Sequence, residues 1–196
     1  MDTHSRSCGG WPGGETNVQI IKHKPGASAE ILPGVVRRYV GKTVSDFPET
    51  VDLSSPETAW SAWHRASGAK DAKALSELSW AKLDPQEIER SWQRGDPEDL
   101  RVYNEAVLGS KLIEVLTYRG ELAETISYLP FPPGKRRQPY SARGFGKIGG
   151  QWKSLGEDRC ASLEDARDTL NRKKDRLWDN FQRIARDHPS TPTAGD

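Results

Sequence analysis

The hydrophobic period of this 196-residue chain changes at Ser110, and that change constrains its fold more than any other feature. From residue 52 to 108, apolar residues recur at the spacing of three and four that is typical of helices. From residue 111 to 155, short runs rich in Ile, Val, Leu, Thr and Tyr are separated by glycine-containing turns, as in antiparallel strands. We therefore expect an α+β protein in which N-terminal helices pack on an antiparallel sheet.

The first helix is predicted to begin near Ser55, because several helix-start signals coincide there. Ser54 or Ser55 can cap the helix, and Pro56 suits its first position. Four residues at helical spacing form its apolar face: Ala59, Trp60, Trp63 and Ala66. Three further helices are expected to start at acidic residues, whose charge favours a helix N-terminus: Asp71, Asp84 and Asp96.

A long C-terminal helix is expected to follow the last strand. Ser162 to Asp165 resembles a capping box, which predicts a helix start. Leucine or isoleucine then recurs every seven residues, at Leu163, Leu170, Leu177 and Ile184. We interpret this stripe as the face of a helix docked on its own domain; the alternative is self-association into a homodimer. Gly149-Gly150, just upstream, predicts a tight hairpin between two strands.

The chain is expected to form one folded domain, from residue 46 to 188, that includes the C-terminal helix. Residues 1–45 contain many glycines and prolines and are predicted to be a partly disordered arm, although 17–22 and 35–40 could form short strands. Residues 189–196, rich in Pro and Thr, are predicted to be a disordered tail.

The formal net charge of +1 gives no overall attraction to nucleic acid or to an anionic membrane. No apolar stretch is long enough to span a bilayer, and Met1 to Gly14 contains no secretory signal. A cytoplasmic location is expected, or an extracytoplasmic one if this is a fragment of a longer membrane-linked protein. Cys8 and Cys160 do not resemble a disulfide framework.

His64 is the only histidine inside a well-predicted element, which makes it a weak catalytic candidate. No carboxylate at motif spacing orients it, so a place at the edge of the core is the favoured interpretation. The spacing of His4, Cys8 and His23 matches no zinc pattern, and we expect neither a metal nor a cofactor. No nucleophile-elbow, P-loop or H-E-x-x-H motif is present.

The segment from Lys135 to Lys153 contains six basic residues, no acidic residue and three aromatic ones. On a sheet, that mixture could contact phosphates and stack on bases. The candidate residues for binding nucleic acid or another anion are Arg136, Arg137, Arg143 and Lys147. A solvated sheet edge explains the same pattern. The near-neutral total charge favours that simpler interpretation, so nucleic acid is an unlikely partner.

Two segments together resemble a known superfamily. One comprises Ser55-Pro-Glu-Thr-Ala-Trp60, the stop at Gly68 and Asp71-Ala-Lys-Ala-Leu75; the other is the strand run that closes at Trp152. Residues 50–156 resemble the nuclear transport factor 2-like (SnoaL-like) superfamily, which includes ketosteroid isomerase and has a cystatin-type cone. More narrowly, the chain looks like uncharacterised domains appended to bacterial sigma factors and membrane-linked regulators. The residues that match these domains are Trp152, Gly156, Asp158, Ser162, Leu163, Glu164 and Ala166.

The resemblance implies that the N-terminal helices pack on a curved, cone-like antiparallel sheet, with a binding site inside the cone. We expect its ligand-binding residues to be Trp60, His64, Tyr103, Tyr118 and Trp152. Because no catalytic motif is recognisable, the favoured function is a non-catalytic, regulatory module that binds a small apolar ligand or a protein partner. The first alternative is an isomerase- or dehydratase-type enzyme with His64 as general base. The second alternative is a nucleic-acid-associated protein that uses the basic strands.

Overall fold

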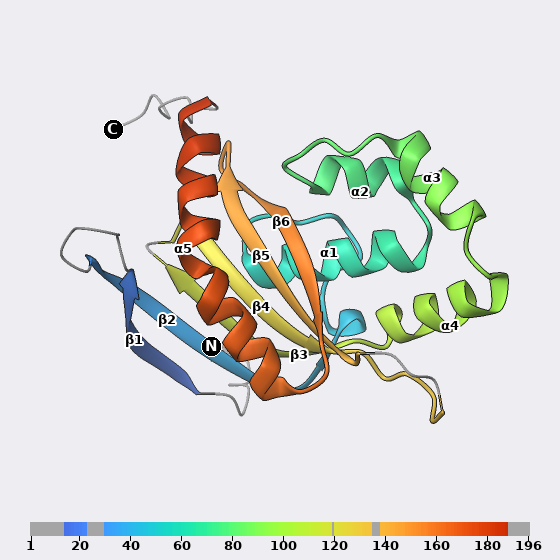
Figure 1. Cartoon of the computed structure of the whole chain (residues 1–196), viewed down its shortest axis with the longest axis horizontal. Coiled ribbons are helices and arrows are strands. Elements are labelled where there is room, and N and C mark those ends of the chain that lie inside the picture. The colour runs from blue at the N-terminus through green and yellow to red at the C-terminus, as the bar shows by residue number, and fades with distance from the viewer. Residues whose placement is uncertain (1–13, 23–29, 119, 135–137, 188–196) are drawn as a thin grey trace, which may run out of the picture.

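The computed structural model of the chain describes residues 14–22, 30–118, 120–134 and 138–187. Within them, a single six-stranded sheet runs in the order β1 to β6, and every neighbouring pair is antiparallel. The strands are β1 (Glu15–Lys22), β2 (Glu30–Thr43), β3 (Lys111–Tyr118), β4 (Leu122–Tyr128), β5 (Tyr140–Ile148) and β6 (Gln151–Cys160). Figure 1 shows how this meander forms the centre of the molecule.

The expected fold class, with helices first and the sheet after them, is wrong. Two strands, β1 and β2, lie within the segment 1–45 and precede the helices, so the sheet spans the chain. The four helices that follow form a connection between β2 and β3. Gly34 of β2 pairs with Tyr118 of β3, and Thr43 pairs with Lys111. Pairing across such a sequence distance leaves no trace in local periodicity, which explains why the order was mispredicted.

The four connecting helices begin where the capping residues predicted. After the short 3-10 turn η1 (Val44–Asp46), they are α1 (Pro56–Gly68), α2 (Ala72–Leu78), α3 (Pro85–Gln93) and α4 (Pro97–Leu108). The Thr58 N–H donates to Ser55 Oγ over 3.2 Å at the start of α1. Three aspartates cap the other helices in the same way: Asp71, Asp84 and Asp96. These local hydrogen bonds satisfy amides that a helix start would otherwise leave unpaired.

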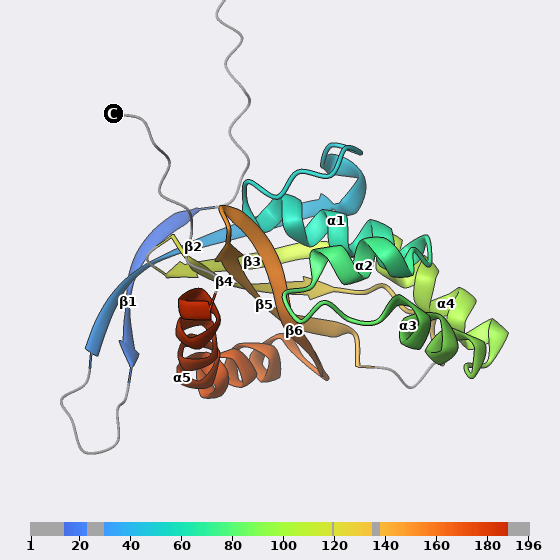
Figure 2. The ribbon, with the colours of Figure 1, turned by 90° about the horizontal axis from the view of Figure 1, so that it is seen from above.

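Helices cover both faces of the sheet. Figure 2 shows α1 to α4 on one face and α5 (Leu163–Asp187) on the other, with the sheet bent between them. The α5 helix approaches β5 closely because glycine faces it: a Cβ added at Gly146 would lie 2.6 Å from Phe181 Cδ2. Each face therefore has a core of its own. In the described part of the chain, no helix combines the length and apolarity that a membrane span needs.

Candidate functional site

Two of the predicted ligand-binding residues, Trp60 and Trp152, belong to the hydrophobic core between α1 and the sheet. Trp60 is 0% exposed and meets the ring of Phe47 edge-on, with 5.7 Å between the ring centroids. Trp152 and Phe145 complete the same cluster. These large side chains pack against one another, so this part of the interior is occupied by the protein itself.

Tyr118, a third predicted ligand-binding residue, lies on the opposite face of the sheet. It packs against Leu122 and against Phe181 of α5, and its hydroxyl donates to Glu124 Oε2 over 2.5 Å. Val115 of the same strand packs with Trp60 on the α1 face. Because successive strand residues point to opposite faces, Tyr118 cannot share a site with Trp60.

His64 is a buried residue of α1 and lies next to Trp60. Its Nδ1–H donates to the Trp60 carbonyl oxygen over 2.8 Å, and the two rings are 4.5 Å apart. Burial, and then the positive charge of Arg143, lower the pKa of His64 from 6.5 to about 4. The imidazole is therefore neutral at pH 7, and it is a weak base.

Arg143 is also buried, and it anchors a group of polar residues that we call the Arg143 cluster: Ser141, Arg143, Ser154, Glu157 and Arg159. Arg143 is 3% exposed, donates from Nη2 to Glu157 Oε2 over 2.6 Å and donates from Nη1 to Ser154 Oγ over 2.8 Å. Its guanidinium carbon lies 4.2 Å from the Trp63 ring centroid. Burial alone would raise the pKa of Glu157, but the charges of Arg143 and Arg159 lower it.

A β-bulge brings the charged residues of this cluster to one face. From the β5–β6 turn, the register pairs Phe145 with Ser154, then shifts by one residue so that Gly144 pairs with Gly156. Arg143 therefore lies opposite Glu157, and both point to the α1 face. Without the bulge, Glu157 would lie on the α5 face, since a one-residue slip reverses every side chain. Sequence reasoning found Arg143 but missed Glu157 and Arg159 for this reason.

Arg159 forms the outer end of the Arg143 cluster, and Tyr103 lies next to it. The Arg159 guanidinium carbon lies 5.4 Å from the Tyr103 ring centroid and 5.7 Å from that of Phe131. Its Nη1 is 3.5 Å from Glu157 Oε1, without a hydrogen bond. Burial, and then the charge of Glu157, raise the pKa of Tyr103. The structure thus brings three predicted residues, His64, Tyr103 and Arg143, into one electrostatic neighbourhood.

The predicted anion-binding set does not form one surface among the described residues. Arg143 is buried, whereas Lys147 is exposed near the β5–β6 turn. Arg136 and Arg137 lie outside the described residues. Within the described ranges, no group of three or more His, Cys, Asp or Glu side chains is placed to hold a metal ion.

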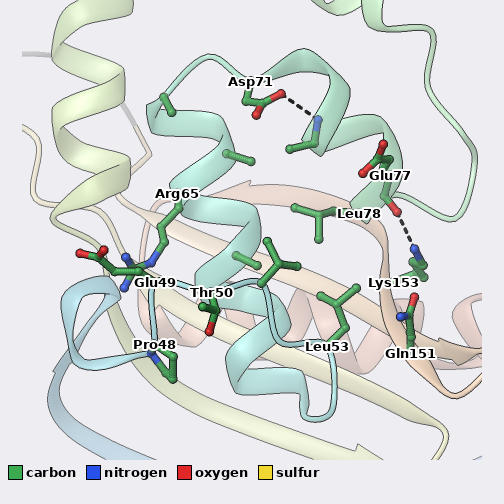
Figure 3. Close-up of a pocket in the computed structure, with 15 residues that line it drawn as sticks. Pro48, Glu49, Thr50, Leu53, Arg65, Asp71, Glu77, Leu78, Gln151 and Lys153 are labelled. Atoms are coloured by element: carbon green, nitrogen blue, oxygen red, sulfur yellow. Dashed lines mark hydrogen bonds between the residues drawn. The ribbon is translucent and has the colours of Figure 1, made fainter.

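A partly open pocket of about 430 Å³ lies on the other side of α1, and Figure 3 shows side chains from four segments around it. Its apolar lining includes Leu53, Ala62, Ala66, Ala74 and Leu78. Backbone hydrogen bonds hold its walls to β6: Trp152 N–H donates to the Leu53 carbonyl over 3.0 Å, and Trp80 N–H to the Ser154 carbonyl over 3.1 Å. None of the predicted site residues that the structure describes lines this pocket.

The charged residues at the rim of the pocket fall into two groups. Both cations are bonded to backbone carbonyls: Arg65 Nη2 donates to Val44 O and Phe47 O over 2.9 and 2.6 Å, and Lys153 Nζ donates to Glu77 O over 2.6 Å. Among the described residues, the side-chain carboxylates of Glu49 and Glu77 make no hydrogen bond or ion pair.

Asp71 is the third carboxylate of the rim. It accepts from Ala74 N–H over 2.9 Å, a bond drawn in Figure 3. Three carboxylates against two cations leave the rim with one surplus negative charge.

Comparison with known proteins adds no relative, because no protein-family model, no curated protein and no solved structure matches this chain.

Proposed function

We propose that this protein is a non-catalytic binding module that holds a small molecule in the pocket beside α1. The observation that carries the proposal is the pocket itself: its volume of about 430 Å³ lies within the range of roughly 300–1,000 Å³ that is usual for small-ligand sites. Its apolar lining beside α1 and α2 would bury the body of such a molecule. The resemblance to uncharacterised domains appended to bacterial sigma factors and membrane-linked regulators makes a regulatory role part of the same proposal.

The charge of the rim selects the kind of ligand. Arg65 and Lys153 already donate to backbone carbonyls, whereas the side-chain carboxylates of Glu49 and Glu77 make no hydrogen bond or ion pair with any described residue. The surplus charge of the rim is negative. A molecule with an apolar body and a positively charged group therefore fits better than an anion of the same size.

The properties of His64 support a non-catalytic module over an enzyme. A pKa of about 4 makes the imidazole a poor proton acceptor at neutral pH, because an effective general base has a pKa near the working pH. Its Nδ1 is also engaged with the Trp60 carbonyl. The pocket lies on another side of α1 and does not include His64.

A pair of charge-matched probes tests the proposal. We would titrate the protein with 2-phenylethylammonium and, separately, with 3-phenylpropanoate, and follow backbone amide signals by NMR. The expected result is saturable shifts at Ala62, Ala66 and Leu78 with the ammonium probe, and weaker binding of the carboxylate at these amides. Absence of saturable shifts at these amides with the ammonium probe would refute the proposal.

A matched pair of variants on α2 locates the site. Ala74 lines the pocket, so Ala74→Phe is expected to fill it and to abolish binding of 2-phenylethylammonium. Lys73 is the neighbouring residue, is exposed and does not line the pocket, so Lys73→Phe should leave binding intact. Equal affinities in the two variants would place the binding elsewhere and contradict the proposal.

A further inference from the structure

We infer that the outer end of the Arg143 cluster is a second binding site, which takes a small organic carboxylate on Arg159. The inference is independent of the pocket, because Arg143, Glu157 and Arg159 do not line it. It rests on four observations: a charge surplus, unpaired donors, solvent access and the shape of the surroundings.

The cluster carries more positive than negative charge. Arg143 and Arg159 face the single carboxylate of Glu157, which the lowered pKa keeps ionised at neutral pH. His64 adds no charge at pH 7, since its pKa is about 4. One positive charge is therefore left uncompensated in a largely buried position, and a monoanion would balance it.

Donors in the cluster lack acceptors. Arg143 Nε and Arg159 Nη1 are buried and have no hydrogen-bond partner among the described residues. The Arg159 side chain makes no hydrogen bond with any described residue; it is held by the loose ion pair with Glu157 and by the two rings. Buried donors are normally paired, so unpaired ones on two adjacent guanidiniums point to an absent acceptor.

Arg159 is the part of the cluster that a ligand can reach. The Arg159 side chain is 24% exposed, whereas that of Arg143 is 4% exposed and is paired with Glu157. An anion arriving from solvent would thus meet Arg159 first. Arg143 would act indirectly, because it holds Glu157 in place. The negative charge of Glu157 weakens the attraction of the site for an anion.

The surroundings favour a carboxylate over a multiply charged phosphate. One surplus charge matches a monoanion, and the planar fork of a guanidinium fits the two oxygens of a carboxylate. Tyr103 and Phe131 flank Arg159 and offer apolar ring surface to the rest of the molecule. The Tyr103 hydroxyl, with its raised pKa, stays protonated and can donate.

NMR titration of the whole chain with benzoate tests this inference, with benzamide as the neutral isostere and inorganic phosphate as the competing anion. We expect saturable shifts of the Arg159 Nε–Hε signal and of the Tyr103 ring with benzoate, and none with benzamide. Absence of a saturable benzoate shift would overturn the inference. Binding of phosphate without binding of benzoate would overturn the assignment to carboxylates.

Two variants move the affinity in opposite directions. Arg159→Gln should abolish benzoate binding, whereas Arg101→Gln, which removes an exposed arginine on α4, should leave it unchanged. Glu157→Gln doubles the surplus charge and should tighten binding by roughly tenfold, because it removes one negative charge at close range. Unchanged binding in Arg159→Gln, or weaker binding in a folded Glu157→Gln protein, would contradict the inference.

Discussion

The two sides of helix α1 use the same backbone for opposite purposes. On the side that faces the sheet, Trp60 and His64 are completely enclosed. On the side that faces α2 and the 48–53 loop, Ala62 and Ala66 border a pocket of about 430 Å³. Trp60 and Trp152, which the sequence suggested as ligand-binding residues, belong to the core, and the open space lies where the helix carries small side chains. For these two tryptophans, aromatic content therefore indicated burial in the core.

The two sides also differ in charge. The inner side ends at the Arg143 cluster, with two guanidiniums and one carboxylate. The rim of the outer pocket has three carboxylates and two cations. One short helix thus separates the proposed anion site from the proposed cation site, in a chain whose net charge is only +1. The net charge of the chain therefore gives no indication that positive and negative charge are separated on the two sides of α1.

The largest expected effect separates the packed side from the open one. Trp60→Ala removes a completely buried ring from the core and should lower the free energy of unfolding by about 3–5 kcal/mol. Val51 lines the pocket and is 68% exposed, so Val51→Ala should change the free energy of unfolding by no more than about 0.5 kcal/mol. Urea unfolding followed by circular dichroism measures both. Similar losses in the two variants would break the comparison.

The next effect concerns the buried ion pair. Arg143→Met leaves the Glu157 carboxylate without its closest counter-charge and should cost about 3 kcal/mol in unfolding free energy. The double variant Arg143→Met/Glu157→Leu removes both charges and should recover part of that loss. Chemical denaturation of the two single variants and the double variant completes the cycle. A simple sum of the single losses would mean that the pair is not coupled.

The pH dependence of stability sharpens the inner side further. The pKa of His64 is about 4 in the folded protein and about 6.5 when unfolded, so below pH 6.5 the unfolded chain takes up a proton that the folded chain does not. This contribution to stability is complete above pH 6.5 and is lost progressively toward pH 4. The loss of unfolding free energy between pH 6.5 and pH 5 amounts to about 2 kcal/mol.

A variant isolates that contribution from other titrating groups. His64→Asn keeps a side-chain donor for the Trp60 carbonyl and removes the titration. Urea unfolding at pH 7, 6 and 5 should show a shallower loss of stability in this variant than in the wild type. Parallel curves would mean that His64 is protonated as easily in the folded state as in the unfolded one.

How much of the fold was predictable depended on how local each signal is. The starts of α1 and α2 follow from Ser55 and Asp71, whose side chains bond amides three residues away. The place of β2 depends on its pairing with β3, which joins residues as far apart as Gly34 and Tyr118, and no residue near β2 in the sequence indicates that pairing. Capping was therefore predicted correctly, and the order of helices and strands was not.

The same distinction explains the sites. Arg143 was found because it lies in a basic segment, but its contact with Glu157 depends on the bulge beside Gly144. If the two strands paired from the hairpin turn without the bulge, Gly156 and not Glu157 would lie opposite Arg143. The pocket was missed because its wall, the 48–53 loop, is fixed by the bond between Leu53 and Trp152, which are far apart in the sequence.

The smallest expected effect tests whether the outer side truly prefers cations. Glu77→Gln removes one unpaired carboxylate from the pocket rim without changing its size. Since exposed charge pairs contribute about 0.2–1 kcal/mol, binding of 2-phenylethylammonium should weaken by a factor of roughly 1.5 to 5. Binding of benzoate at Arg159 should not change, because that site lies beyond α1. An equal loss of both ligands would mean that the two sides do not act independently, so this small effect is the most direct check on the comparison.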